Sequence, residues 1–90
     1  MSKIEFDETK EAANLTKHGI SLARAKDLKV LAILEDDRID YGEQRFRAFG
    51  TIDGQAHCLV FTERNGVMRI ISLRRAHAKE IARYAKTQND

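Results

Sequence analysis

Apolar positions in the first part of the chain recur at helical spacing, and cap signals divide them into two segments. Asp7 can act as a helix N-cap, and the helix that follows should end at Lys17 and His18 because Gly19 supplies a left-handed C′ residue. Ser21 can then cap a second, shorter helix. The side chains that these helices should turn inward are Ala12, Ala13 and Leu15 in the first, and Leu22, Ala25 and Leu28 in the second.

From residue 30 onward the pattern changes to the shorter period of β-strands. Residues 30–34 form an apolar run of strand length, and the polar residues 35–43 after it indicate an exposed loop. Asp53-Gly54 and Arg64-Asn65-Gly66 are turn signals, and they separate three strands of an antiparallel meander, residues 45–52, 57–62 and 67–73. Alternation in the first of these strands places Phe46, Ala48 and Ile52 on one face and Arg45, Arg47 and Phe49 on the other.

Helical spacing returns at the end of the chain. Residues 76–86 should form a closing helix whose inward stripe is Ala78, Ile81, Ala82 and Ala85. A chain of 90 residues is long enough for one domain and too short for two. The sequence therefore predicts a single α+β domain over residues 1–90, with two N-terminal helices and a C-terminal helix packed on an antiparallel β-sheet.

Composition and charge narrow the functional class. With 42% apolar and 33% charged residues the chain should form a packed core, and the absence of a membrane-length apolar run or a secretory signal predicts a cytoplasmic protein. The single cysteine, Cys58, stands among apolar neighbours and should be a buried hydrophobe. The net charge of +2 is too small to indicate a nucleic-acid partner, but basic residues gather between Tyr41 and Tyr84. They are Arg45, Arg47, Arg64, Arg69, Arg74, Arg75, Lys79 and Arg83.

The spacing of potential ligands disfavours cofactor chemistry. The histidines and the cysteine lack the close spacing of a zinc site. Gly50 and Gly54 do not precede a helix that begins with Lys-Ser or Lys-Thr, as a phosphate loop would require. We therefore expect no metal site and no cofactor.

Four groups of residues stand in a distinctive order and spacing. They are Phe6-Asp7 with Lys10, then Asn14 with Lys17-His18-Gly19-Ile20, then Glu43 and Arg45 with Gly50, and finally Arg69-Ile70-Ile71-Ser72 with Arg74, Ala76, Glu80 and Tyr84. Together they resemble the BrnT toxin family over nearly the whole chain. The resemblance implies a bacterial ribonuclease toxin with a RelE-like fold, an RNA substrate, and a cognate antitoxin of the BrnA type that binds DNA through its own ribbon-helix-helix region.

Metal-independent RNA cleavage needs cations that stabilise a negatively charged transition state. Arginine suits this role because its guanidinium stays charged and binds phosphate oxygens in pairs. Arg45 and Arg74, on neighbouring segments of the expected sheet, are the first candidates. Arg69 points away from Arg74 in a regular strand, so only a β-bulge near Ser72 would bring both to one site.

Cleavage also needs a base for the 2′-hydroxyl and an acid for the 5′-oxygen. His18 titrates near neutral pH, although Lys17 and His18 would equally complement the C-terminal end of a helix dipole. Glu80 can act as a base or hold an arginine of the sheet, and Tyr84 can contact RNA or pack in the core. His57 alternates with Cys58 in a strand and is expected to be structural.

The sequence thus predicts a metal-independent endoribonuclease toxin that is neutralised in a hetero-oligomer with its antitoxin. The catalytic candidates are Arg45, Arg74, His18, Lys17, Glu80 and Tyr84, and the further RNA-binding candidates are Arg47, Arg69, Arg75 and Arg83. The alternative is a non-catalytic RNA-binding or antitoxin-binding module, such as an inactivated toxin. Both readings use the same positive surface and differ only in whether an acid and a base lie within reach.

Overall fold

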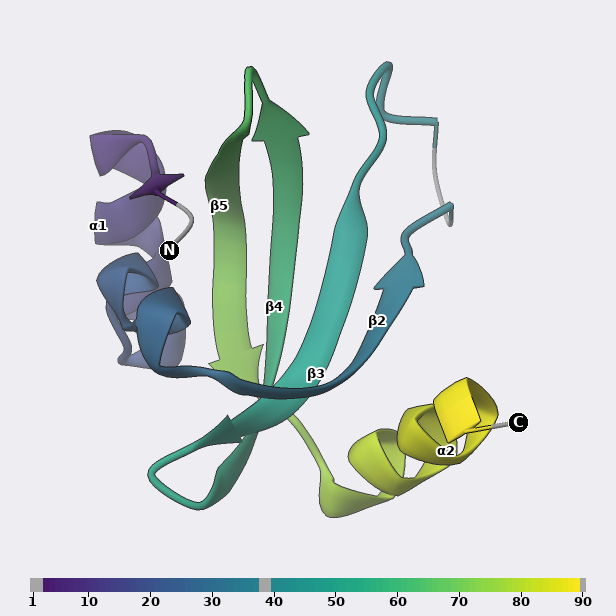
Figure 1. The fold of residues 1–90 in the computed structure, drawn as a ribbon. Helices are drawn as coiled ribbons and strands as arrows, with labels where there is room; N and C mark the ends of the chain where they lie inside the picture. Colours follow the sequence, from purple (N-terminus) through teal and green to yellow (C-terminus); the bar gives the residue numbers. More distant parts are fainter. Residues whose placement is uncertain (1–2, 38–39, 90) are drawn as a thin grey trace.

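A computed structural model describes residues 3–37 and 40–89, with side chains through Arg83. The elements in chain order are β1 (Ile4–Glu5), α1 (Glu8–His18), the 3-10 helix η1 (Leu22–Asp27), β2 (Lys29–Glu35), β3 (Phe46–Ile52), β4 (Gln55–Arg64), β5 (Val67–Arg75) and α2 (Ala78–Asn89). Figure 1 shows this α+β arrangement, which confirms the predicted class. Within the described residues, the helices are too short and too polar to cross a membrane.

The strands form one mixed sheet of five strands in the order β1-β5-β4-β3-β2. The strands from β2 to β5 make an antiparallel meander, whereas β1 runs parallel to β5, with Ile4 opposite Met68 and Glu5 opposite Arg69. The predicted antiparallel sheet is therefore correct for the meander and wrong for its first edge. Since β1 has only two residues, alternation along the sequence could not reveal it.

Both predicted hairpin turns are confirmed. Asp53 and Gly54 have φ values of 52° and 75°, and Asn65 and Gly66 have values of 54° and 79°. Positive φ at both central residues is the geometry of the type I′ turn, whose twist matches that of the flanking strands. These turns set the register of β3, β4 and β5.

The predicted ends of the first helix are also confirmed. The backbone N–H groups of Lys10 and Thr9 donate to the Asp7 carboxylate at 3.2 and 2.7 Å, and these hydrogen bonds lower the pKa of Asp7. Gly19 ends α1 in the left-handed conformation at φ 71° and donates its N–H to the Leu15 carbonyl at 2.9 Å.

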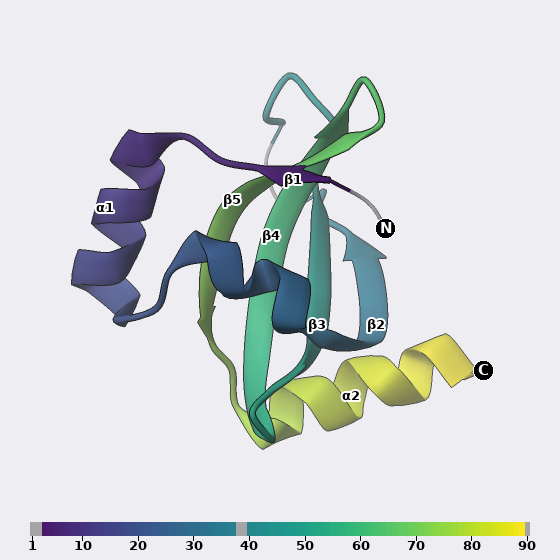
Figure 2. The ribbon, with the colours of Figure 1, turned by 60° about the vertical axis from the view of Figure 1, so that its left-hand side comes forward.

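The predicted inward stripe of α1 is wrong. Ala12 and Ala13 are exposed and Leu15 is 45% exposed, whereas Asn14 is only 5% exposed. The reason is that α1 lies beside the edge of the sheet at β5 and does not cover a face, as Figures 1 and 2 show. A strand edge presents peptide groups, so a polar side chain fits there better than an apolar one.

The second predicted helix is present as the 3-10 helix η1. Ser21 caps it by accepting the Ala23 N–H at 3.1 Å, and Leu22 and Ala25 point inward with exposures of 0% and 8%. The Glu11 carboxylate of α1 accepts the Ser21 hydroxyl at 2.6 Å and the Leu22 N–H at 2.8 Å. This carboxylate ties the two helical segments together.

The closing helix begins two residues later than predicted, at Ala78. The Glu80 carboxylate accepts the His77 backbone N–H at 3.2 Å, which makes His77 the capping position. Within the predicted inward stripe, Ile81 is half-buried, Ala78 and Ala82 are exposed, and the side chain of Ala85 lies outside the described residues. The predicted stripe is therefore wrong at Ala78 and Ala82, and α2 packs against β2 and β3.

The hydrophobic core lies between η1 and one face of the sheet (Figure 2). Its buried members are Leu22, Ala25, Ala48, Ile52, Leu59, Phe61, Ile70 and Leu73. A second buried group, Ala32, Phe49 and Cys58, pairs across β2, β3 and β4 and alternates with the first. It therefore faces the other side of the sheet, so the predicted division of residues 45–52 between two faces is confirmed, as is the burial of Cys58.

Candidate active site

The strand β5 carries a β-bulge at Ile71. Ile70 pairs with Phe61 and Ser72 pairs with Val60, which are consecutive residues of β4, so Ile71 is left out of the pairing. A bulge of this kind shifts the alternation of side chains by one residue. The residues after Ile71 therefore face the opposite side from the one that regular alternation assigns to them.

The bulge brings two predicted arginines to the same face. Arg69 pairs with Thr62, and Arg74 pairs with Cys58. Thr62 and Cys58 are four residues apart on β4 and share a face, so their cross-strand partners share it too. In a regular strand Arg69 would point away from Arg74, and the bulge next to Ser72 reverses that expectation. Arg69, Ser72 and Arg74 form a polar row on the face away from the core.

The helix α1 and this bulge line an open hollow of about 190 Å³. Its lining residues are Lys10, Ala13, Asn14, Lys17 and His18 of α1 with Ile71 and Ser72 of β5. Positions 10, 14, 17 and 18 recur at the spacing of one helix side, which α1 turns toward β5. The hollow thus combines ammonium groups, an imidazole and a hydroxyl.

His18 is placed to accept a proton in this hollow. Its partial burial, the Lys17 ammonium and the Arg74 guanidinium lower its pKa from the ordinary 6.5. The imidazole is therefore neutral at neutral pH although cations surround it. A phosphate that entered the hollow would favour the protonated ring by its negative charge, so the same site could first take a proton and then hold it.

Glu80 forms an ion pair with Arg74, which is one of the two roles that the sequence predicted for Glu80. The guanidinium nitrogens of Arg74 lie 3.4 and 3.5 Å from the Glu80 carboxylate oxygens. Arg74 and the backbone N–H of His77 lower the pKa of Glu80. Glu80 is therefore an anion with reduced basicity at neutral pH, which suits a positioning role for Arg74 better than proton abstraction.

Arg45 belongs to a different cluster, on the segment before β3. Its guanidinium lies 4.1 Å from the centroid of the Tyr41 ring, and its Nε lies 3.3 Å from the Glu43 carboxylate. Glu43 also binds Arg64, at 2.7 Å, and Arg64 is the main cause of the lowered pKa of Glu43.

The structure does not bring Arg45 and Arg74 together. Phe49 of β3 lies at the level of Arg74, because both pair with Cys58 of β4. Arg45 lies four residues before Phe49, so the two arginine backbones are separated by about 13 Å along the strand and about 10 Å across two strand spacings.

The further RNA-binding candidates are spread over several surfaces. Arg47 shares the face of Ser72, since both pair with Val60, and its guanidinium lies 5.9 Å from the Phe49 ring. Arg75 follows Arg74 and points to the opposite face. Arg83 is exposed on α2, and the side chain of Tyr84 lies outside the described residues.

Arg75 lines a second hollow, of about 260 Å³, together with His18 and His57. His57 is 4% exposed, and its Nδ1 lies 2.7 Å from the Gln55 carbonyl oxygen, which agrees with the expected structural role. Among the residues that the structure describes, no group of three or more His, Cys, Asp or Glu side chains is arranged to hold a metal ion.

Three polar residues that line the first hollow, Lys10, Asn14 and Ser72, were not among the predicted site residues. Lys10 had a readable signal, because it lies at helical spacing from Asn14 and Lys17. Ser72 belonged to the motif that carries the family resemblance, but its orientation depends on the bulge.

The comparisons with known proteins give one family. A family model described as "Ribonuclease toxin, BrnT, of type II toxin-antitoxin system" matches residues 6–80 of the 90-residue chain. That range contains α1, the whole meander and the beginning of α2, and with them both walls of the first hollow. A search of curated proteins found no match.

Proposed function

The chain belongs to the BrnT family, ribonuclease toxins of type II toxin-antitoxin systems, and from this premise we propose that it is an endoribonuclease that cleaves RNA without a metal ion. The proposed active site is the hollow between α1 and the β5 bulge, with the arginines beside it. The observation that carries this proposal is that α1 and the β5 bulge place His18, Lys17 and Ser72 around one hollow, where burial, Lys17 and Arg74 lower the pKa of His18. A neutral base among fixed cations is the combination that cleavage by the 2′-hydroxyl requires.

In the proposed reaction His18 takes the proton of the 2′-hydroxyl, whose oxygen then attacks the adjacent phosphorus. Arg74, oriented by Glu80, stabilises the charge that grows on the phosphoryl oxygens. Arg69, whose guanidinium lies 3.5 Å from the Glu5 carboxylate farther along β5, contacts a neighbouring phosphate. The bond to the 5′-oxygen breaks, and Lys17 supplies the proton that this oxygen takes up. The products are a 2′,3′-cyclic phosphate and a free 5′-hydroxyl.

The remaining candidates receive roles that follow from their positions. Arg47, on the same face as Ser72, extends the positive surface for RNA, and Arg45 contacts RNA farther along the molecule without touching the reacting phosphate. Arg75 and Arg83 are assigned to phosphates outside the reaction centre. We also assign Tyr84 a contact with RNA.

At the level of the cell, we propose that cleavage of cytoplasmic RNA inhibits translation and growth until a cognate antitoxin binds the toxin. The N-terminal helices followed by an antiparallel meander support the RelE-like arrangement that the resemblance implies. The alternative, a non-catalytic RNA-binding or antitoxin-binding module, retains the positive surface and lacks only the proton transfers.

Incubation of the purified protein with total bacterial RNA in excess chelator separates these functions. The proposal expects cleavage with 2′,3′-cyclic phosphate ends, and it expects His18→Gln to reduce the rate by roughly 10²- to 10⁴-fold, the scale of a lost general base. His77→Gln is the matched control, because His77 is an exposed histidine at the start of α2.

Two results would count against the proposal. If the protein does not cleave RNA in chelator but does so when a divalent ion replaces the chelator, the cleavage depends on a metal. RNA binding without cleavage, unchanged by His18→Gln, would favour the non-catalytic module.

A further inference from the structure

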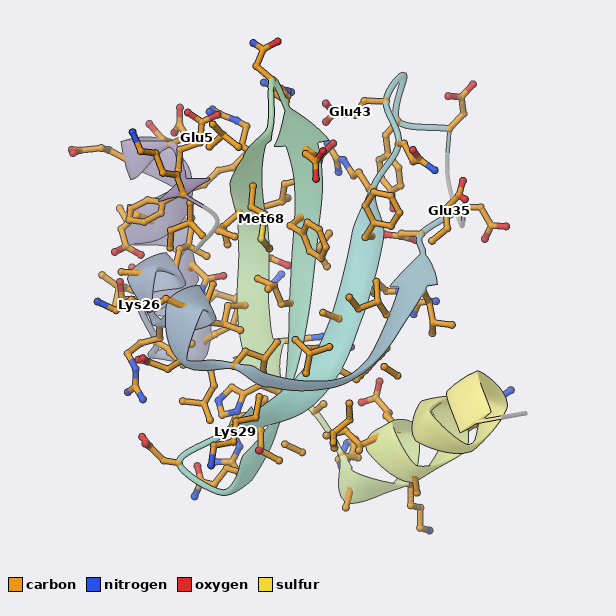
Figure 3. The ribbon with its side chains drawn as sticks, in the orientation of Figure 1. Glu5, Lys26, Lys29, Glu35, Glu43 and Met68 are labelled. Atoms are coloured by element: carbon orange, nitrogen blue, oxygen red, sulfur yellow. The ribbon has the colours of Figure 1, made fainter. Side chains whose placement is uncertain are left out.

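The core face of the sheet carries an apolar groove that η1 does not fill. The groove has a volume of about 340 Å³ and lies between η1 and β2. Its lining includes Ile4, Leu28, Val30, Ile33, Phe61 and Met68. Figure 3 shows Met68 on this face, between η1 and the outer strand β2. The groove faces away from the side that carries Arg69, Ser72 and Arg74.

The edge strand β2 contributes an unusual concentration of exposed apolar surface. Val30, Leu31 and Ile33 are 50%, 51% and 44% exposed, and the remaining large hydrophobic side chain of comparable exposure in the described residues is Leu15 on α1. Single exposed apolar side chains are common on proteins, but exposed side chains that line one groove, here Val30 and Ile33, are typical of an interaction surface. The residues that the structure describes leave about half of each of these three side chains uncovered.

We propose that an amphipathic helix of the cognate antitoxin binds in this groove and places its apolar stripe against Val30, Ile33 and Met68. The inference rests on the proposed toxin function, because a type II toxin requires such a partner. It does not depend on the catalytic roles given to His18 and Arg74.

The charges around the groove complement an ordinary helix. Lys26 lines the groove at the η1 side, whereas Glu35 ends β2 at the far side, and Figure 3 shows these two residues on opposite sides of Met68. Glu63 pairs with Met68 and therefore shares its face. A helix with acidic residues in its first turn and basic residues in its last turn matches this arrangement when its N-terminus lies near Lys26.

Other occupants fit the groove less well. RNA would meet Glu35 and Glu63 and an apolar floor in place of the arginine row on the opposite face. A second copy of the chain paired along β2 would meet the register shift between Val30 and Ala32, which interrupts a regular edge. Edge pairing would also leave the floor of the groove at Phe61 and Met68 uncovered.

The test measures binding of the protein encoded by the neighbouring reading frame to the purified chain and its variants. Ile33→Glu and Val30→Glu should each weaken binding by at least about 30-fold, the scale of an interface hot spot. Leu15→Glu is the matched control, because Leu15 has nearly the same exposure as Ile33 and lies on another surface. It should change affinity by less than about threefold.

Melting curves of the free variants show whether each one is folded, and RNA cleavage without antitoxin is measured on the same samples. The proposal expects Ile33→Glu to cut RNA at the unaltered rate and to escape inhibition by the antitoxin. If neither the unaltered chain nor any variant cuts RNA, but Ile33→Glu still binds the antitoxin more weakly than Leu15→Glu does, the catalytic proposal fails and the docking proposal stands.

The docking proposal is overturned if folded Ile33→Glu and Val30→Glu bind the antitoxin as tightly as the unaltered chain does. It is also overturned if sedimentation shows that the free chain is a dimer that Ile33→Glu dissociates, since the groove would then belong to a second copy. A Glu35→Lys, Glu63→Lys variant that loses affinity in low salt and regains it in high salt would support the proposed orientation.

Discussion

Asn14 of α1 and Leu73 of β5 exchange two hydrogen bonds across a separation of 59 residues. The Asn14 Nδ2 donates to the Leu73 carbonyl at 2.9 Å, and the Leu73 N–H donates to the Asn14 Oδ1 at 3.2 Å. The same amide also donates to the Ile20 carbonyl at 2.8 Å. This side chain makes the contacts that a neighbouring strand would make, and it fixes Lys17 and His18 relative to the β5 bulge.

Asn14→Ala should therefore lower the free energy of unfolding by roughly 2–4 kcal/mol, because it leaves buried peptide groups of Leu73 and Ile20 without their partner. Urea unfolding measures the effect. Thr16→Ala, at an exposed position of the same helix, should cost less than about 0.5 kcal/mol. Equal stabilities of the two variants would show that the edge contact does not hold α1 in place.

The pH dependence of cleavage tests the base. Since burial, Lys17 and Arg74 lower the pKa of His18, the acid limb of kcat/KM should have its midpoint below the ordinary value of 6.5. Activity is present above that midpoint, where the imidazole is neutral, and is lost as the pH falls through it. Lys17→Gln should move the limb to higher pH because it removes a positive charge, while Lys79→Gln on α2 should leave it in place. A limb unaffected by Lys17→Gln would assign the titration to another group.

Arg74 and Arg45 should differ in their effect on catalysis. Arg74→Ala should lower the cleavage rate by roughly 10²- to 10³-fold with little change in RNA affinity, the scale of losing one preorganised charge donor. Arg45→Ala should mainly weaken RNA binding, because Arg45 contacts Tyr41 and Glu43 away from the hollow. Single-turnover kinetics separate rate from affinity. Two variants that both cut at the unaltered rate would refute the assigned active site.

Gly50 and Gly54 offer a test of how β2 is seated. A methyl group at Gly50 would run into the Lys29 carbonyl and the Val30 backbone of β2, whereas Gly54 has open space and only a positive φ of 75°. Gly54→Ala should cost about 1 kcal/mol from backbone strain. Gly50→Ala should cost more, roughly 1–3 kcal/mol, as β2 is pushed outward.

Hydrogen exchange gives the local readout for this pair. Gly50→Ala should speed exchange in β2 relative to the inner strands β4 and β5, and Gly54→Ala should not. The reverse order of stabilities would mean that β2 adapts to the added methyl without strain.

Much of the fold was readable because its signals are local. Asp7 and Gly19 bounded the first helix, the two turns contained their residues with positive φ, and alternation divided residues 45–52 between two faces. The inward stripe of α1 was misread because apolar periodicity assumes that a helix covers a face. Here α1 meets an edge and buries Asn14.

The sequence by itself determined the class, the meander and the chemistry available to the candidate site, since caps, turns and alternation act over a few residues. The tertiary structure alone decided which candidates meet. The register between β4 and β5 places the bulge at Ile71 and turns Arg69 and Arg74 to one face, and the edge contact of Asn14 holds α1 against β5 so that His18 lies beside Arg74. Both depend on hydrogen bonds between distant segments, and pairing of this kind leaves no periodic trace in the sequence of either partner.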